Sequence, residues 1–189
     1  MSWFMVEKLK ETRKTRRRDI IDTELISEIL DMKINDFIKK YRPPPTIYIT
    51  VKKGTKLYNV LKAIATGHPV MIIVVDEDRK PIGYLTDYHI LSSFARRSRP
   101  RSILASFSIS QISIPIEKSL DIPVEDLMDK RPPLISLDNK VKDLIRTIRS
   151  LGVPAVIIVD KNNIIRGVID RRFLVKTLLN NLLGEPTMF

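Results

Sequence analysis

One short pattern occurs twice in the chain and constrains the fold more than any other feature. Residues 74–83 and 158–167 each contain an apolar run, an Asp, a turn-forming stretch and a Gly. Asp76 recurs as Asp160, which sets the spacing at 84 residues. Each copy predicts a strand, a turn and a second strand, so we interpret both Asp residues as turn acids. A pattern that returns at constant spacing indicates a duplicated fold with an internal pseudo-twofold axis.

Apolar periodicity predicts further elements around these hairpins. Each half reads in the order strand, helix, strand, strand, helix, which makes the fold class α/β of the mixed α+β kind. In the first half we expect a strand at 47–51, a helix at 56–65, strands at 70–76 and 81–85, and a helix at 87–95. In the second half we expect a short helix at 124–128, a strand at 134–137, a helix at 140–150, strands at 155–160 and 164–169, and a helix at 171–183.

Charge and proline content mark the boundaries between segments. Residues 1–18 hold seven Lys or Arg against two Glu, without Gly or Pro, which favours a basic helical arm. Tyr41-Arg-Pro-Pro-Pro45 ends the helical region before the first strand. The predicted domains are a basic N-terminal arm with a linker helix (1–31), a first repeat (32–95), an Arg-rich connection (96–121), a second repeat (122–183) and a C-terminal tail (184–189).

The composition excludes several classes of protein and of site. The 189-residue chain has no Cys, which rules out disulfides and Cys-ligated zinc, and its two His cannot form a His-rich metal site by themselves. No constellation of nucleophile and base is evident, so we expect neither an enzyme nor catalytic or metal-ligating residues. The apolar run from Val70 to Val75 is too short to cross a bilayer, and the first residues do not resemble a signal peptide. We therefore expect a cytoplasmic protein without a membrane partner.

The doubled order of elements, each copy closing on apolar–Asp–turn–apolar–Gly, resembles the CBS domain. Two copies in tandem resemble a Bateman module of the archaeal, stand-alone type. The stretches Asn35-Asp36-Phe37-Ile38 and Glu125-Asp126-Leu127-Met128 resemble the segment that precedes the first strand in this family. The resemblance implies a flattened, pseudo-symmetric sandwich with clefts that hold adenine nucleotides or related ligands. It also implies a homodimer formed through the helices.

The resemblance implies a nucleotide motif as well, from which the first half departs at one position. In the family, Gly-apolar-apolar-Thr/Ser-x-x-Asp ends the repeat, where the hydroxyl contacts phosphate and the Asp binds the ribose hydroxyls. The first half reads Gly83-Tyr-Leu-Thr86-Asp-Tyr-His89. Thr86 therefore fits the motif, whereas His89 replaces the Asp.

The second half departs from the motif at two positions. Asp170 replaces the hydroxyl and would repel phosphate, although Arg171 and Arg172 could compensate for it. Phe173 replaces the ribose-binding Asp, and we expect its ring to fill the cleft. We interpret these positions as a vestigial nucleotide site. We expect that the protein requires no cofactor and that the ligand of this site, if it keeps one, is an adenine nucleotide. Its residues are Thr86, His89, Asp170 and Phe173.

Positive charge is the second clue to function. A net charge of +11 and a pI of about 9.9 favour a polyanionic partner, most often nucleic acid, although many surface lysines on a thermophilic protein would give the same excess. The cations cluster in the arm and in the connection, and no motif for base-specific readout is visible. The predicted RNA contacts are Lys8, Lys10, Arg13, Lys14, Arg16, Arg17, Arg18, Arg96, Arg97, Arg99 and Arg101.

Two functions follow from these observations. The leading prediction is a non-catalytic tandem CBS protein that binds structured RNA, in particular ribosomal RNA on the ribosome, and acts there as a regulatory or hibernation-like factor. The alternative is a module that senses adenine nucleotides and regulates a partner enzyme or transporter. Calorimetry with nucleotides and nuclease-sensitive recovery of ribosomal proteins distinguish the two.

Overall fold

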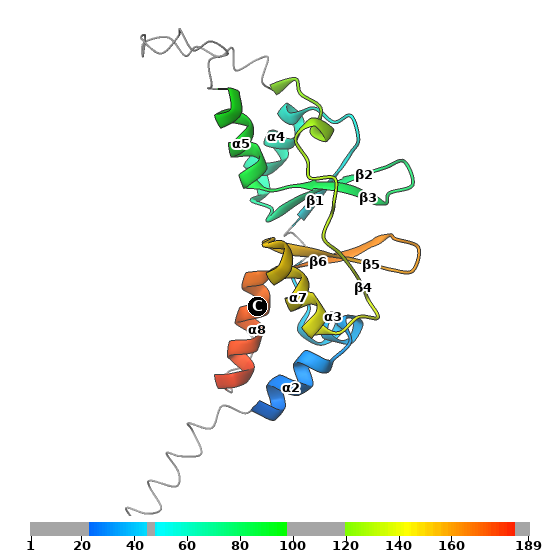
Figure 1. Cartoon of the computed structure of the whole chain (residues 1–189), viewed down its shortest axis with the longest axis vertical. Helices are drawn as coiled ribbons and strands as arrows, with labels where there is room; N and C mark the ends of the chain where they lie inside the picture. The colour runs from blue at the N-terminus through cyan, green and yellow to red at the C-terminus, as the bar shows by residue number, and fades with distance from the viewer. Residues whose placement is uncertain (1–22, 45–47, 98–119, 184–189) are drawn as a thin grey trace, which may run out of the picture.

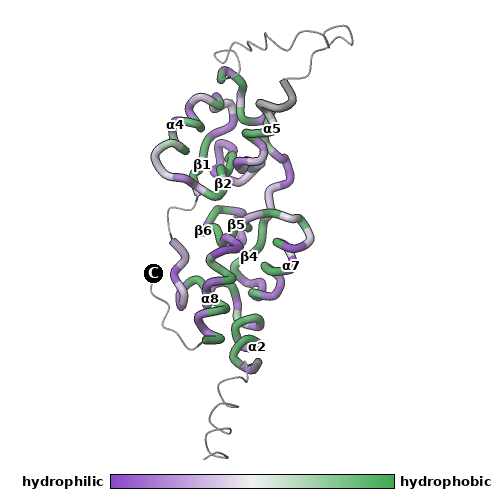
Figure 2. The backbone as a smooth tube through the Cα atoms, turned by 90° about the vertical axis from the view of Figure 1, so that its left-hand side faces the viewer, coloured by the Kyte–Doolittle hydropathy of each residue, from purple (hydrophilic) through white to green (hydrophobic). Residues whose placement is uncertain are grey.

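The computed structural model describes residues 23–44, 48–97 and 120–183, which form two halves stacked end to end (Figure 1). In two perpendicular views the strands lie toward the middle of the molecule and the helices lie on the outer sides (Figure 1, Figure 2). The elements of the first part of the chain are α2 (Thr23–Asp31), α3 (Ile34–Tyr41), β1 (Tyr48–Lys52), α4 (Leu57–Gly67), β2 (Met71–Val75), β3 (Pro81–Leu85) and α5 (Asp87–Arg97). Those of the second part are the 3-10 helix η2 (Val124–Asp126), β4 (Leu134–Ser136), α7 (Val141–Leu151), β5 (Ala155–Val159), β6 (Ile165–Asp170) and α8 (Arg171–Leu183).

Each half contains a three-stranded sheet with the same strand order and pairing. In the first half β2 lies between β1, to which it is parallel, and β3, to which it is antiparallel. In the second half β5 lies between β4 and β6 in the same way. The register shifts also correspond, because they fall at Val74/Val75 and Ile158/Val159. The predicted mixed α/β fold with a β-α-β-β-α order in each half is confirmed.

The hairpin turns explain why an Asp recurs in the sequence. The Asp76 carboxylate accepts the N–H of Lys80 at 2.8 Å, and the Asp160 carboxylate accepts those of Asn162 and Ile164 at 2.8 and 3.0 Å. The hydrogen bond from Ile164 is the largest influence that lowers the pKa of Asp160. Both carboxylates therefore stabilise turns, as predicted, by satisfying backbone donors that the hairpin leaves unpaired.

The two central strands are buried along their whole length, because each lies between helices and the opposite half. Ile72 and Val74 of β2 belong to a core that they share with α4 and α5. Met71, Ile73 and Val75 alternate with them and join the larger core, which contains the second half. The halves therefore share one hydrophobic interface, and this interface fixes the two walls of the cleft described below.

The helix α3, with which the first repeat begins, packs on the second half. The N–H of Ile34 donates to the carbonyl of Asn139 at 2.8 Å. Phe37 is fully buried, and its ring lies edge-on to that of Phe173, with centroids 6.1 Å apart. The apolar face of α3 is thus covered by elements that lie a hundred residues later in the sequence.

The segment with which the second repeat begins packs, in return, on the first half. The N–H of Val124 donates to the carbonyl of Thr55 at 2.9 Å, and Asp129 and Tyr84 exchange two backbone hydrogen bonds of 3.0 Å. Ile34 and Val124 occupy equivalent places in this exchange. The exchange ties each half to the chain that leads into the other half, so the two repeats cannot separate without breaking both cores.

The preceding helix, α2, also belongs to the second half. Ile29 is buried against this half, and Asp31 forms ion pairs of 3.1 and 2.8 Å with Lys140 and Lys142 at the start of α7. The hydrogen bonds from Lys142 and Lys140 lower the pKa of Asp31. Helical structure is therefore present in the predicted linker helix, and its inner face contributes to the core.

Candidate functional site

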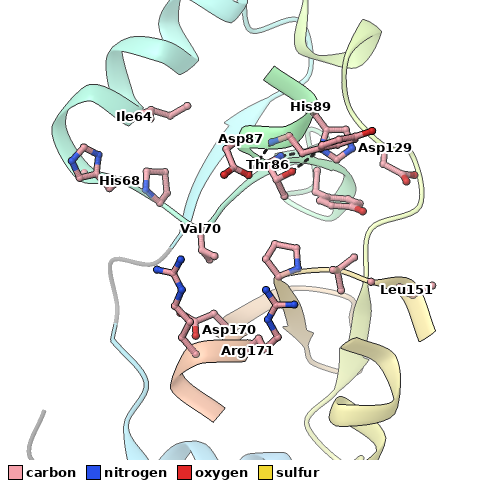
Figure 3. Close-up of a pocket in the computed structure, with 18 residues that line it drawn as sticks. Ile64, His68, Val70, Thr86, Asp87, His89, Asp129, Leu151, Asp170 and Arg171 are labelled. Atoms are coloured by element: carbon pink, nitrogen blue, oxygen red, sulfur yellow. Dashed lines mark hydrogen bonds between the residues drawn. The ribbon is translucent and has the colours of Figure 1, made fainter. Parts of the chain in front are cut away.

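A cleft of about 910 Å³ lies between the halves, where α5 and α8 begin. This volume lies within the range of small-molecule sites. Figure 3 shows Thr86, Asp87 and His89 on the wall formed by the first half, and Asp170 and Arg171 on the opposite wall. The two walls are pseudo-equivalent, since Thr86 and Asp170 are 84 residues apart. We call residues 86–89 the first corner and residues 170–173 the second corner.

In the first corner, Thr86 and His89 are hydrogen-bonded to each other. The N–H of Thr86 donates to Nδ1 of His89 at 3.1 Å, and the Thr86 hydroxyl oxygen lies 2.9 Å from the same nitrogen. A backbone N–H can only donate, so Nδ1 is an acceptor and the hydroxyl donates to it as well. The pair resembles one side of a capping box at the start of α5. The hydroxyl proton of the buried Thr86 is therefore committed to His89.

In the second corner, Asp170 caps α8. Its carboxylate accepts the N–H of Phe173 at 2.5 Å, the usual bond between an N-cap residue and the third helical residue. The expectation that Phe173 fills the cleft is wrong, because its side chain is 5% exposed and packs against Phe37 of α3. The helix α3, which packs on the opposite half, thus forms part of the core that surrounds this ring. Thr86, His89 and Asp170 come together at the cleft, and Phe173 does not.

Two arginines make the second corner electropositive. Arg171 and Arg172 lie in the first turn of α8, are exposed and line the cleft. Neither forms an ion pair with a described residue. By contrast, three other described arginines form ion pairs with carboxylates: Arg131, Arg146 and Arg166. The N-terminus of a helix carries partial positive charge, so cations there are unfavourable until an anion joins them.

The carboxylates on the first wall are already engaged by backbone donors. Asp87 accepts the N–H of Tyr88 at 2.8 Å, and Asp129 accepts that of Arg131 at 2.8 Å. Burial, with a smaller contribution from Asp129, raises the pKa of Tyr84, which therefore stays neutral at physiological pH. The cleft is thus polarised, with acidic and aromatic groups on the first wall and cations on the second.

The helices that end at the cleft differ in one residue. His68 follows α4 with a φ of 45°, and Gly152 follows α7 with a φ of 64°. These equivalent residues both line the cleft. The left-handed conformation costs about 1–2 kcal/mol for a residue other than Gly. Sequence reasoning missed His68 as a cleft residue, although the spacing of 84 aligns it with a Gly and could have revealed it.

The predicted RNA contacts fall on parts of the chain for which no side chains are described. Lys8 to Arg18, Arg99 and Arg101 lie outside the described residues. Arg96 and Arg97 lie in the last turn of α5, but their side chains are not among those described. RNA binding by these residues therefore stays a prediction. Lys and Arg also outnumber Asp and Glu in the described ranges, so the positive excess is not confined to the arm and the connection.

Two kinds of feature are absent from the described part of the chain, a helix that could span a membrane and a cluster of metal-ligating side chains. None of its helices has the length and apolarity needed to cross a bilayer. Within the same residues, no three His, Asp or Glu side chains are grouped in a way that could hold a metal ion. The polar groups that converge in the cleft are therefore the strongest candidate site in this part of the chain.

Comparison with known proteins identifies the family. A model of the CBS domain matches residues 34–96 and 124–179, which together make up more than half of the chain. No curated protein matches the chain. The match covers most of both repeats and begins with α3, the helix that packs on the opposite half.

Solved structures with the same fold share little sequence with this chain. A CBS domain protein from Pyrobaculum aerophilum, in complex with AMP, is 16% identical with a TM-score of 0.58, over 81% of this chain and 99% of that one. CBSX2, also in complex with AMP, is 18% identical with a TM-score of 0.57, over 79% and 97%. The cytosolic domain of the Mg²⁺ channel MgtE, in complex with ATP, is 14% identical with a TM-score of 0.51, over 70% and 45%. At these identities the likeness establishes the fold alone.

Proposed function

The chain belongs to the CBS domain family and carries the domain twice, and we propose that it is a regulatory module that binds a phosphorylated adenine nucleotide in the cleft between the repeats. The observation that carries the proposal is the pair Arg171 and Arg172 at the start of α8, which line the cleft without a carboxylate partner among the described residues. In this proposal the protein has no catalytic activity and acts in the cytoplasm. Structures of the same fold in complex with AMP and ATP support the choice of adenine nucleotides.

An anion in the second corner would relieve an unfavourable arrangement of charge. It would neutralise Arg171 and Arg172 and would accept N–H groups from the first turn of α8. A hydrogen bond to a charged group contributes about 1.5–3 kcal/mol, so two arginines outweigh the repulsion from Asp170, whose carboxylate is already capped by a backbone donor. The first corner is a weaker phosphate site because the Thr86 hydroxyl is committed to His89.

The first wall suits the other end of a nucleotide. Tyr88 lines the cleft and is 72% exposed, which leaves its ring accessible to a stacked base. A ligand with its base on this wall and its phosphates on Arg171 and Arg172 would join the two halves. Regulation then follows if the ligand stabilises one relative placement of the repeats over another, and a partner protein distinguishes the two placements.

Calorimetry with AMP, ATP and S-adenosylmethionine tests the proposal. We expect the phosphorylated ligands to bind and S-adenosylmethionine, which has no phosphate, to bind more weakly. Replacing both cleft arginines (Arg171→Gln with Arg172→Gln) should weaken ATP binding about 10- to 100-fold, equivalent to about 1.4–2.7 kcal/mol. Arg149→Gln is the matched control, because this exposed arginine of α7 lies outside the cleft lining. The absence of nucleotide binding, or an equal loss in the control, would overturn the proposal.

Homodimer formation through the helices stays a prediction. Leu91 of α5 is 66% exposed and is the apolar residue that we expect at such a contact. Sedimentation velocity of the full chain over a range of concentrations tests this, with Leu91→Asp as the variant that should shift the equilibrium to monomer. A single species of monomer mass at all concentrations would contradict it.

RNA binding is a second candidate function, and the clusters of cations in the arm and the connection favour it. In this candidate the CBS pair is a scaffold, and contacts to RNA phosphates give affinity that falls steeply with salt. Co-sedimentation with ribosomes at moderate salt tests it, with the variant in which Arg96, Arg97, Arg99 and Arg101 become Ala. Failure to co-sediment, or unchanged co-sedimentation of the variant, would contradict it.

A further inference from the structure

The helix α8 carries apolar residues on two opposite faces. Phe173 and Leu174 are buried on the inner face, whereas Val175, Leu179 and Leu183 are 49%, 48% and 68% exposed. These three outer residues follow one another at intervals of four, so they form one row along the helix. A helix that is apolar all round is normally covered on all sides, and the outer row of α8 has no cover among the described residues.

A second row of polar and basic residues runs beside the apolar one. It consists of Arg172, Lys176 and Asn180, again at intervals of four residues. The two rows line a shallow groove of about 390 Å³, in which no carboxylate is present among the described lining residues. We call the residues that line this groove the docking face: Arg171, Arg172, Val175, Lys176, Leu179 and Asn180.

The charges of the docking face favour an acidic partner. Arg171 and Arg172 form no ion pair with a described residue, and Lys176 adds a third cation. Cations beside an apolar centre fit a segment that presents carboxylates next to large apolar side chains. We propose that the docking face binds an acidic amphipathic helix of a partner protein, in the manner of a helix in a groove. Apolar side chains of the partner pack on Val175 and Leu179, and its carboxylates pair with the three cations.

The equivalent helix of the first half lacks this combination. At the spacing of 84 residues Val175 corresponds to Leu91 of α5, which is 66% exposed. The three cations of the docking face correspond to Asp87, Tyr88 and Ser92. Both helices therefore expose an apolar residue, but only α8 places a cation at all three neighbouring positions. An acidic partner should accordingly select α8 over α5.

Charge and side-chain type argue against two other occupants. Two docking faces in contact would bring their cations together, and α5 of a second copy has one acidic residue, Asp87, against Arg96 and Arg97. An RNA strand would pair with the cations but would leave Val175 and Leu179 without an apolar partner. The described residues that line the groove also include no aromatic ring on which a base could stack.

Docking has a consequence for the cleft, and this consequence rests on the proposed function. Arg171 and Arg172 line both the cleft and the docking face, whereas Lys176 lines the docking face and not the cleft. A guanidinium group that holds a phosphate in the cleft is lost to a carboxylate in the groove. The nucleotide and the partner helix therefore compete, and by thermodynamic linkage each weakens the binding of the other by the same factor.

Fluorescence anisotropy with a synthetic peptide tests docking on the full chain. The apolar row from Val175 to Leu183 rises about 12 Å, so a labelled helical peptide of about 16 residues is long enough to cover it. Its leucines are spaced four apart, and glutamates occupy the adjacent row. One control peptide has lysine in place of each glutamate, and a second has the acidic sequence scrambled so that no row forms. We expect the acidic peptide to bind about tenfold more tightly than either control.

Paired substitutions locate the bound peptide. Lys176→Gln should weaken peptide binding about two- to fivefold and leave ATP binding unchanged. Its control is Lys161→Gln, which removes an exposed cation from the hairpin turn of the second half and should have a smaller effect. Leu179→Ser should likewise weaken peptide binding, whereas Leu91→Ser, the same change at an exposed leucine of α5, should not.

Several results would overturn the proposal. Equal or tighter binding of either control peptide would show that the acidic row is not recognised, and equal losses in test and control variants would show that the peptide binds elsewhere. A dimer in sedimentation velocity that Leu179→Ser abolishes would show that a second copy covers the docking face. An RNA oligonucleotide that Leu179→Ser and Lys176→Gln both weaken, and that binds more tightly than the acidic peptide, would assign the face to RNA.

Saturating ATP tests the shared arginines separately. We expect ATP to weaken peptide binding several-fold in the wild type and to have no such effect when Arg171 and Arg172 are both replaced by Gln. Failure of ATP to bind would overturn the proposed function and leave the docking result intact. If ATP binds and the affinity for the peptide stays the same, the competition is overturned.

Discussion

The two halves of the molecule share their backbone and differ in the chemistry of their corners. Both corners begin with the residue that precedes a helix: Thr86, whose hydroxyl is bonded to His89, and Asp170, whose carboxylate accepts the N–H of Phe173. The next residue is Asp87 in one half and Arg171 in the other. A side-chain oxygen is present at the position before the helix in both halves, whereas the exposed residue that follows is acidic in one half and basic in the other. A duplicated fold can therefore keep its architecture while the cleft between its halves becomes acidic on one side and basic on the other.

The two segments that pack on the opposite half, α3 and the stretch that begins with η2, also differ in how much they stabilise the fold. The first is the eight-residue helix α3, whose Phe37 is fully buried. The second is the three-residue 3-10 helix η2 and the chain after it, where Leu127 is only partly buried. The first exchange thus buries more apolar surface and should contribute more to the free energy of unfolding.

Truncation of the two equivalent apolar residues sharpens this comparison and should give the largest effect. Phe37→Ala should lower the free energy of unfolding by about 3–5 kcal/mol, because the ring is replaced by a cavity between Tyr41 and Phe173. Leu127→Ala should lower it by less, roughly 1–2 kcal/mol, since the side chain is half-buried. Urea unfolding followed by circular dichroism measures both. Equal losses would show that the exchanged segments contribute equally.

The glycines of the repeated pattern provide the next comparison. A methyl group on Gly83 would clash with the Met128 side chain and lie 2.9 Å from the Asp129 carbonyl oxygen, whereas no described atom lies within 4 Å of one on Gly167. Gly83→Ala should therefore destabilise the protein by about 1–3 kcal/mol. Gly167→Ala should change stability by less than about 1 kcal/mol. Thermal unfolding of the two variants decides, and similar melting temperatures would contradict the close approach at Gly83.

The hairpin acids predict a difference that depends on pH. Asp160 accepts two backbone N–H groups and pairs with Arg166 at 2.6 Å, so Asp160→Asn should destabilise more than Asp76→Asn. The pKa of Asp160 is lower in the folded chain than in the unfolded one, where it is about 3.9. Its stabilisation is then present above that value and lost as the pH falls through the folded pKa. Melting temperatures of wild type and Asp160→Asn should converge below about pH 4, and a constant gap would refute the assignment.

Substitutions at the residues that follow α4 and α7 should give the smallest changes, and one of them should increase stability. His68→Gly removes a side chain from a left-handed backbone and should raise the free energy of unfolding by about 1 kcal/mol. Gly152→His should have the opposite sign. Strained residues cluster at functional sites, where they serve the function. If the His68 side chain contacts the ligand, the stabilised variant should also bind ATP more weakly. Loss of stability in His68→Gly would show that the histidine makes compensating contacts.

The sequence was sufficient for the fold because its signals are local and repeated. The alternation around Asp76 and Asp160 predicts both hairpins, and the 84-residue spacing then aligns the helices that pack on them. The exchange of segments was not predictable in the same way. Ile34 pairs with Asn139 and Val124 pairs with Thr55, and no periodic pattern within either segment indicates which half it covers.

The candidate site was predictable only in part. The motif located both corners, because Thr86 and Asp170 follow directly from the repeated Gly. The orientation of Phe173 depends on α3, a partner far away in the sequence, so the prediction for its ring was wrong. The bond between Thr86 and His89 likewise depends on the geometry of a helix start, which the motif alone does not specify.

Exchange of the two corners tests the central claim, that one wall of the cleft holds the anion. The first variant, Arg171→Asp with Arg172→Tyr, gives the second corner the residues of the first and should reduce ATP affinity about 100-fold. Adding Asp87→Arg and Tyr88→Arg to this variant transfers the cations to the opposite wall, beside the N-terminus of α5, and should restore most of the affinity. Calorimetric titration with ATP gives both values. Full affinity in the first variant, or no recovery in the second, would contradict a polarised cleft that binds phosphate through these arginines.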